Sequence, residues 1–192
     1  MKKLMIALAA VVCAAGVQAA SIQWSSGMNA ATAKGGAELA SGKTIYFVLD
    51  SYVASITEAI NKGTFSSSTE GVLDAKATTN TKGRFNPPPA ATVTSSLLKL
   101  DAEGKGVSTD FRLLVVDDWS VTGETWYKFS AITSQATYDE KAEVPVPSSV
   151  SFTSTAWNGG TTWAKAESVP EPTSAMLLLL GVAGLALRRR RA

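Results

Sequence analysis

Apolar segments at both ends of the chain leave only its middle part free to fold as a water-soluble domain. At the N-terminus, Lys2 and Lys3 precede an almost wholly apolar run from Leu4 to Val17. Small residues then occupy the −3 and −1 positions of a cleavage site before Ala20. This three-part pattern is typical of a secretory signal peptide. We therefore predict that residues 1–19 are removed during export.

Because we predict export, the residue types that the chain lacks are informative. Its single cysteine, Cys13, lies within the apolar run, and there is no histidine. After signal removal the chain has no disulfide, so an ordinary hydrophobic core must stabilise it. Ser-His-Asp triads, Cys-His pairs and His or Cys zinc sites are excluded. Carboxylate chemistry and non-catalytic binding remain.

The charge balance argues against a nucleic-acid partner. The whole chain has 18 Lys and Arg against 16 Asp and Glu. Six of the basic residues, namely Lys2, Lys3 and Arg188 to Arg191, lie at the two ends. The rest of the chain therefore carries 12 basic against 16 acidic residues, a net charge of −4. An acidic domain lacks the basic surface that nucleic-acid binding requires.

The C-terminal segment combines three features in a fixed order. Val-Pro-Glu-Pro occupies residues 169–172, residues 174–187 carry no charge, and Arg188, Arg189, Arg190 and Arg191 follow. As a helix, the uncharged run would be about 21 Å long, whereas a bilayer core is about 30 Å thick. We predict a short transmembrane helix at 174–187 with the arginines on the cytoplasmic side.

Together these three features resemble the PEP-CTERM sorting signal. The resemblance covers about the last 24 residues. It implies recognition by exosortase, a membrane-embedded protease, with Pro170, Glu171 and Pro172 as the recognition residues. The protein would be anchored transiently in the inner membrane and then released to the cell surface or extracellular matrix, near exopolysaccharide. The alternative is a membrane anchor that is never processed.

The middle of the chain shows the alternation of apolar and polar residues that is typical of strands. We predict a β-rich passenger domain at residues 20–156 and a flexible stalk at 157–168. The strongest strands are residues 43–50, 107–116 and 124–132, and weaker ones are 91–100 and 149–155. Their shared faces carry Ile45, Phe47 and Leu49; Val107, Phe111, Leu113 and Val115, interrupted by Thr109; and Tyr127, Phe129 and Ala131.

One segment of the domain has helical spacing instead. Val53, Ile56 and Ile60 recur at helical intervals within residues 52–62. Ser55 and Glu58 form a candidate capping box, and Gly63 is a candidate C-terminal stop. The predicted fold is mainly β, a small β-sandwich-like domain with one short helix, plus the C-terminal hydrophobic helix. The alternative is an open sheet with a helix.

Carboxylates supply the candidates for catalysis or metal binding. Asp117 and Asp118 are adjacent in a predicted hairpin loop, residues 117–123. A glycoside hydrolase needs two carboxylates facing each other across a sugar, so a turn explains this pair better. Residues 101–110 are acidic but lack the spacing of an EF-hand calcium loop. We predict no catalytic residue, no metal site and no cofactor.

Tryptophans supply the candidates for ligand binding. Trp126 alternates with Tyr127 and Phe129 and so lies on the opposite face, and Trp119 is in the adjoining loop. Exposed indoles form platforms for sugars, although a second sheet could equally cover them. We expect a non-catalytic structural or adhesive protein. The first alternative is a lectin-like carbohydrate-binding module that uses Trp119 and Trp126, and the second is a carboxylate-dependent glycoside hydrolase.

Overall fold

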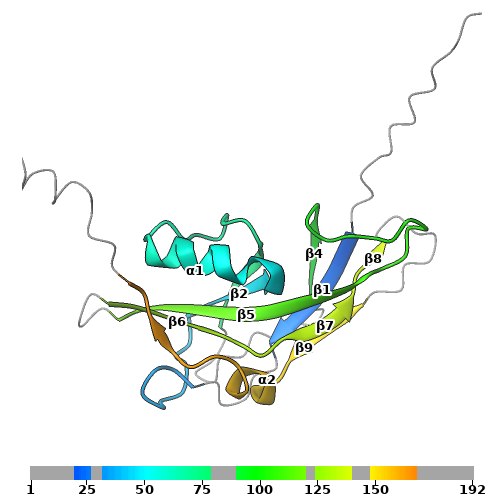
Figure 1. The fold of residues 1–192 in the computed structure, drawn as a ribbon. Coiled ribbons are helices and arrows are strands. Elements are labelled where there is room, and N and C mark those ends of the chain that lie inside the picture. Colours follow the sequence, from blue (N-terminus) through cyan, green and yellow to red (C-terminus); the bar gives the residue numbers. More distant parts are fainter. Residues whose placement is uncertain (1–19, 27–31, 79–89, 120–123, 140–147, 168–192) are drawn as a thin grey trace, which may run out of the picture.

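The computed structural model describes residues 20–26, 32–78, 90–119, 124–139 and 148–167 (Figure 1). Strands make up most of the regular secondary structure, as the sequence predicts. The strands are β1 (Ala20–Ser26), β2 (Thr44–Leu49), β3 (Val72–Ala77), β4 (Ala91–Ser95), β5 (Ser108–Trp119), β6 (Glu124–Phe129), β7 (Thr133–Ala136), β8 (Tyr138–Asp139), β9 (Ser149–Phe152) and β10 (Ala164–Lys165). The helices are the 3-10 turn η1 (Asp50–Tyr52), α1 (Val53–Asn61) and α2 (Ser154–Asn158).

The strands form two sheets. The larger sheet has the order β10-β6-β5-β2-β3, and β7 pairs with the beginning of β5. In the smaller sheet β1 is central, with β4 on one side and β8 and β9 on the other. All of these pairs are antiparallel except β1 with β9, which is parallel.

The main hydrophobic core lies between the two sheets, so the domain is a sandwich and the alternative of a single open sheet is wrong. The predicted inward faces of β2 and β5 are confirmed, because Ile45, Phe47, Leu49, Phe111, Leu113 and Val115 are all buried in this core. From the smaller sheet, the Trp24 ring stacks on Phe47 with 5.1 Å between ring centroids. Its indole nitrogen donates to Asp74 Oδ2 at 2.9 Å, so this tryptophan joins the two sheets.

Helix α1 covers the outer face of the larger sheet (Figure 1). Its buried residues Ile56 and Ile60 pack against Val48, Leu114 and Phe129 in a second core cluster. The helical spacing of the sequence is therefore confirmed. Tyr127 and Phe129 share a face as predicted, but this face lies under α1 and not between the sheets.

The ends of α1 agree only in part with the sequence. Gly63 has a φ of +68°, and its N–H donates to Ile60 O while Thr64 N–H donates to Ala59 O. These bonds form a Schellman motif, which confirms the predicted stop. The capping box is wrong, because the helix begins at Val53 and Ser55 lies within its first turn. Ser55 Oγ donates back to Tyr52 O at 3.1 Å.

Two strands, β5 and β9, end at other residues than the sequence predicts. The predicted hairpin of β5 and β6 is confirmed, but β5 continues through Asp117 to Trp119, residues expected in the loop. The strand expected at 149–155 ends at Phe152, since the Thr153 side chain accepts from Ala156 N–H and starts α2. This second short helix is absent from the sequence prediction.

The segment expected to be a flexible stalk packs on the domain up to Glu167. Trp157 in α2 is fully buried, and β10 pairs with β6. The indole nitrogens of Trp157 and Trp163 both donate to Thr32 O at 3.3 Å. The predicted hydrophobic helix at 174–187 lies outside the described residues. Within the described residues, no helix has the length and apolar character needed to cross a membrane.

Candidate functional site

The two segments that carry the processing signals border the described fold directly. Residues 1–19, Pro170, Glu171, Pro172 and Arg188 to Arg191 lie outside the described residues. Ala20, the first described residue, is fully buried in β1. At the other end, Ala166 N–H donates to Thr125 O at 2.8 Å and Glu167 N–H to Asn61 Oδ1 at 3.2 Å. The packed chain therefore reaches to within three residues of Pro170.

Trp126, one of the two predicted glycan contacts, is half-buried between charged groups. The amine of Lys34 lies 3.1 Å from the centroid of its ring, which is a cation–π contact. Its indole nitrogen donates to Glu124 Oε2 at 3.2 Å. Hydrogen bonds from Lys165 and then Trp126 hold the pKa of the Glu124 carboxyl below its usual value. One face of the ring is therefore occupied by Lys34.

Trp119, the other predicted contact, ends β5 opposite Glu124 of β6, and its side chain lies outside the described residues. Asp117, two residues before Trp119, is in a strand and not in a solvated turn. The Asp117 residue is only 7% exposed and pairs with the Lys43 amine. Asp118 follows Asp117 in β5, and its side chain lies outside the described residues.

The acidic segment at residues 101–110 makes a tight turn. Asp101 Oδ1 accepts from the backbone N–H groups of Glu103 and Lys105, at 3.1 and 2.6 Å. Leu100 and Gly106 then form an isolated bridge. In the described part of the chain, no three His, Cys, Asp or Glu residues are grouped so that they could hold a metal ion.

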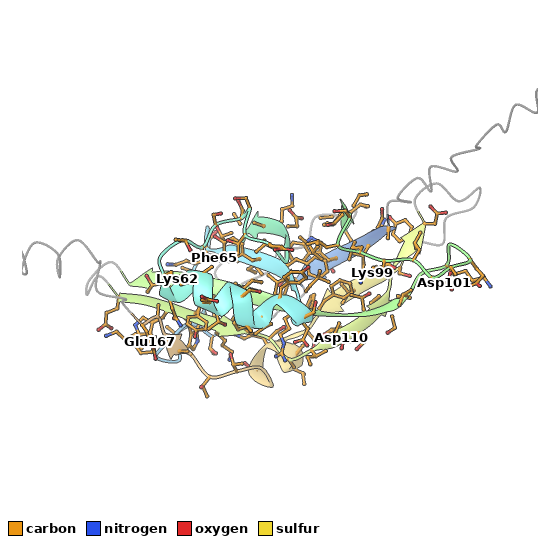
Figure 2. The ribbon with its side chains drawn as sticks, turned by 45° about the horizontal axis from the view of Figure 1, so that its top comes forward. Lys62, Phe65, Lys99, Asp101, Asp110 and Glu167 are labelled. Carbon is orange, nitrogen blue, oxygen red and sulfur yellow. The ribbon has the colours of Figure 1, made fainter. Side chains whose placement is uncertain are left out.

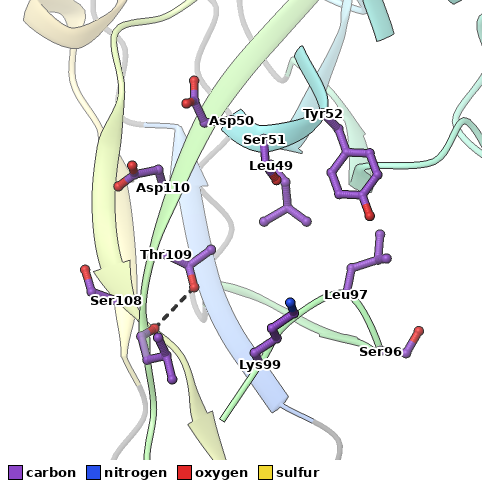
Figure 3. Close-up of a pocket in the computed structure, with 11 residues that line it drawn as sticks. Leu49, Asp50, Ser51, Tyr52, Ser96, Leu97, Lys99, Ser108, Thr109 and Asp110 are labelled. Atoms are coloured by element: carbon purple, nitrogen blue, oxygen red, sulfur yellow. Dashed lines mark hydrogen bonds between the residues drawn. The ribbon is translucent and has the colours of Figure 1, made fainter. Parts of the chain in front are cut away.

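A cleft of about 640 Å³ lies at one end of the sandwich, and we call it the Lys99 cleft (Figure 3). It lies between the first residues of β5, the turn η1 and the segment after β4. Thr109 and Val107 form its floor, and Leu49, Tyr52, Leu97 and Lys99 surround it. By the alternation of β5, its floor continues the inner face that Phe111, Leu113 and Val115 carry into the core.

Both carboxylates at the Lys99 cleft are engaged by other groups. Asp50 pairs with Arg112, which also donates to Ser130 O at 2.8 Å. Asp110 accepts from Ser134 Oγ on β7. Figure 3 shows Asp50 and Asp110 on one side of β5, with Lys99, Leu97 and Tyr52 on the other. Lys99 is thus the charged group that faces the open space.

A buried threonine holds two walls of the Lys99 cleft together. Thr137 is 2% exposed, and its hydroxyl donates to Lys99 O at 2.6 Å and accepts from Val107 N–H at 3.3 Å. Its backbone N–H donates to Val107 O at 3.1 Å. A Cβ on Gly106 would lie 1.4 Å from Thr137 O, so this approach requires glycine. These bonds therefore fix the Lys99 and Val107 walls of the cleft relative to each other.

Sequence reasoning missed the Lys99 cleft because its residues come from three separate segments. One signal was present, since Thr109 interrupts the apolar face of β5. The structure gives the reason: this part of the inner face opens into the cleft, where Val107 is 36% exposed.

Comparison with known proteins assigns the C-terminal segment. Residues 168–191 match the model of the PEP-CTERM protein-sorting motif, as the sequence predicts. The motif indicates an exported protein that is sorted by an exosortase and held transiently at the membrane before cleavage. No curated protein and no solved structure matches the chain significantly.

Proposed function

We propose that this chain, which carries a PEP-CTERM sorting motif at residues 168–191, is a non-catalytic structural or adhesive protein of the cell surface or extracellular matrix. The motif match is the observation that carries the export and sorting part of the proposal. The signal-peptide pattern at residues 1–19 supports it independently, because a sorting tail serves only a chain that leaves the cytoplasm.

The fold is compatible with processing at both ends. Ala20 is paired with Ser95 on one side and with Asp139 on the other, so a peptidase would reach the bond before it most easily in the unfolded chain. At the other end, only Ser168 and Val169 separate the packed Glu167 from Pro170. The domain would therefore lie close to exosortase while the tail is still attached.

Cell fractionation tests the sorting proposal. In the native host, we expect wild type at the surface or in the medium. A variant with Pro170→Ala, Glu171→Ala and Pro172→Ala should stay in the membrane fraction, since the recognition residues are lost. A Ser168→Ala variant serves as the matched control, and it should behave as wild type. Surface delivery of the triple variant at the wild-type level would contradict the proposal.

Carbohydrate binding is the second candidate function. The Lys99 cleft favours it, because a hydroxyl-lined concavity beside an aromatic ring suits a sugar. Trp119 and Trp126 remain the candidate contacts from the sequence. On a glycan array, loss of binding in Trp126→Ala with an unchanged circular dichroism spectrum would place the contact at Trp126. Unchanged binding would mean that Trp126 does not contact the sugar.

A further inference from the structure

We propose that the Lys99 cleft binds a carboxylated segment of an acidic polysaccharide, with the Lys99 amine contacting a sugar carboxylate. The proposal deepens the second candidate function and rests on it. Its volume of about 640 Å³ lies within the range of small-molecule sites, roughly 300–1,000 Å³. The cleft therefore has room for a short run of sugar rings.

The lining of the cleft is suited to a hydroxylated ligand. Hydroxyl groups come from Ser51, Ser96 and Thr109. Thr109 Oγ1 donates to Val107 O at 3.2 Å, so toward a ligand it would accept, whereas a serine hydroxyl can both donate and accept. The Tyr52 ring and Leu97 supply apolar surface for the C–H face of a sugar ring. Few purely apolar ligands would satisfy these hydroxyls, because a polar group that is buried without a partner is costly.

The charge in the cleft selects a carboxylated sugar. Lys99 is exposed, and no described residue forms an ion pair with it. Asp50 is paired with Arg112, and the Asp110 carboxylate, which accepts from Ser134 Oγ, lies on the other side of β5 from Lys99 (Figure 3). A single amine gives one charge-assisted hydrogen bond to a carboxylate. A neutral sugar would lack that contact.

The cleft is also built in advance and placed for access. Thr137 and the close approach at Gly106 fix its walls, so little ordering is needed on binding. Figure 2 shows Lys99 and Asp110 at one end of the domain, and Lys62 and Glu167 at the other. Since the chain leaves toward its sorting tail at Glu167, the cleft lies at the end remote from the tether.

Calorimetry with defined oligosaccharides tests this proposal. The full chain would be kept in a detergent without a sugar headgroup and titrated with a trimer of a hexuronic acid. A neutral hexose trimer of the same linkage would be the second ligand. We expect binding of the acidic trimer, and affinity at least tenfold weaker for the neutral one. No binding of the acidic trimer, or equal affinity for both, would overturn the proposal.

Charge variants locate the contact. Lys99→Gln should weaken binding of the acidic trimer at least tenfold, and Lys99→Arg should restore most of it. Lys105→Gln is the matched control, because Lys105 is exposed on the neighbouring turn, and it should bind as wild type. Equal binding by Lys99→Gln would overturn the assignment, provided its melting temperature is unchanged. Surface sorting is measured separately at the C-terminus, so failure of the cleft leaves the sorting proposal standing.

Discussion

At the scale of single residues, two lysine amines lie against indole rings at the end of the sandwich near the C-terminal exit. Lys34 lies over Trp126, and the Lys128 amine lies 5.0 Å from the centroid of Trp157. Lys128 is only 7% exposed, and burial lowers the pKa of its amine. A lysine in such a site gains some cation–π attraction but loses hydration, and we expect the loss to be larger.

We expect Lys128→Met to melt at a higher temperature than wild type at pH 7, by about 1 kcal/mol in unfolding free energy. The folded-state pKa of Lys128 is below the unfolded value of about 10.4, so the cost of the charge is complete below the folded pKa. That cost disappears as the pH rises through the folded pKa toward the unfolded one. The gap between the two melting temperatures should therefore narrow between pH 7 and pH 10.

Calorimetric melts of both proteins across that range measure this gap. Lys62→Met is the control, because Lys62 is an exposed residue that pairs with Glu58 on the surface of α1. Its melting temperature should differ little from that of wild type. A Lys128→Met protein that melts below wild type at pH 7 would show that the cation–π contact outweighs desolvation.

At the scale of elements, helix starts depend on which residue precedes the first turn, and the sequence alone misplaced one of them. Thr153 has extended backbone angles, and its side chain accepts from Ala156 N–H, so it is a true N-cap. The residue in that position of α1 is Tyr52, which makes no side-chain cap bond. Ser55, predicted to cap, only bonds back to Tyr52 O.

We therefore expect Thr153→Ala to destabilise the fold by about 1 kcal/mol, and Ser55→Ala by less than about 0.5 kcal/mol. Urea unfolding followed by tryptophan fluorescence gives both values. The two threonine and serine hydroxyls are removed by the same kind of substitution, so each variant is the other's control. If Ser55→Ala lost more unfolding free energy than Thr153→Ala, that result would support the predicted capping box.

Strands with clear alternation could be predicted, and strands lined by small polar residues could not. In β2 and β5 large apolar side chains recur at every second position, so the inward face of each strand follows directly. In β1, the buried positions include Ser21 and Ser26 beside Ile22 and Trp24. The hydroxyl of Ser21 is hydrogen bonded to Thr94 Oγ1 at 2.8 Å, a partner that only the folded sheet supplies.

The Lys99 cleft could not be predicted for the same physical reason. The Thr137 hydroxyl joins two of its walls, because it bonds to both Lys99 O and Val107 N–H. Both partners lie far from Thr137 in the sequence. Periodicity reports which face of one element is buried, but it carries no information on where two elements leave a gap. Only the interruption at Thr109 pointed to this place.

At the scale of the whole molecule, the folded unit extends beyond the predicted boundary at residue 156. Trp157 is fully buried in the main core, and Trp163 packs against it. A chain of residues 20–167 should therefore fold cooperatively. A chain of residues 20–156 should lose at least about 3 kcal/mol, the usual cost of removing a large buried aromatic side chain.

Circular dichroism melts of these two chains compare them directly. The shorter chain should have a much lower melting temperature, or no cooperative transition. Equal melting temperatures would mean that residues 157–167 form a dispensable stalk after all.

The central claim is that the chain is exported and sorted through its C-terminal motif. Intact-mass spectrometry of the protein recovered from the surface or medium of its native host tests this claim most directly. We expect an N-terminus at Ala20 and a C-terminus that has lost the segment ending in Arg191-Ala192. Recovered surface protein that still ends in Arg191-Ala192 would contradict it.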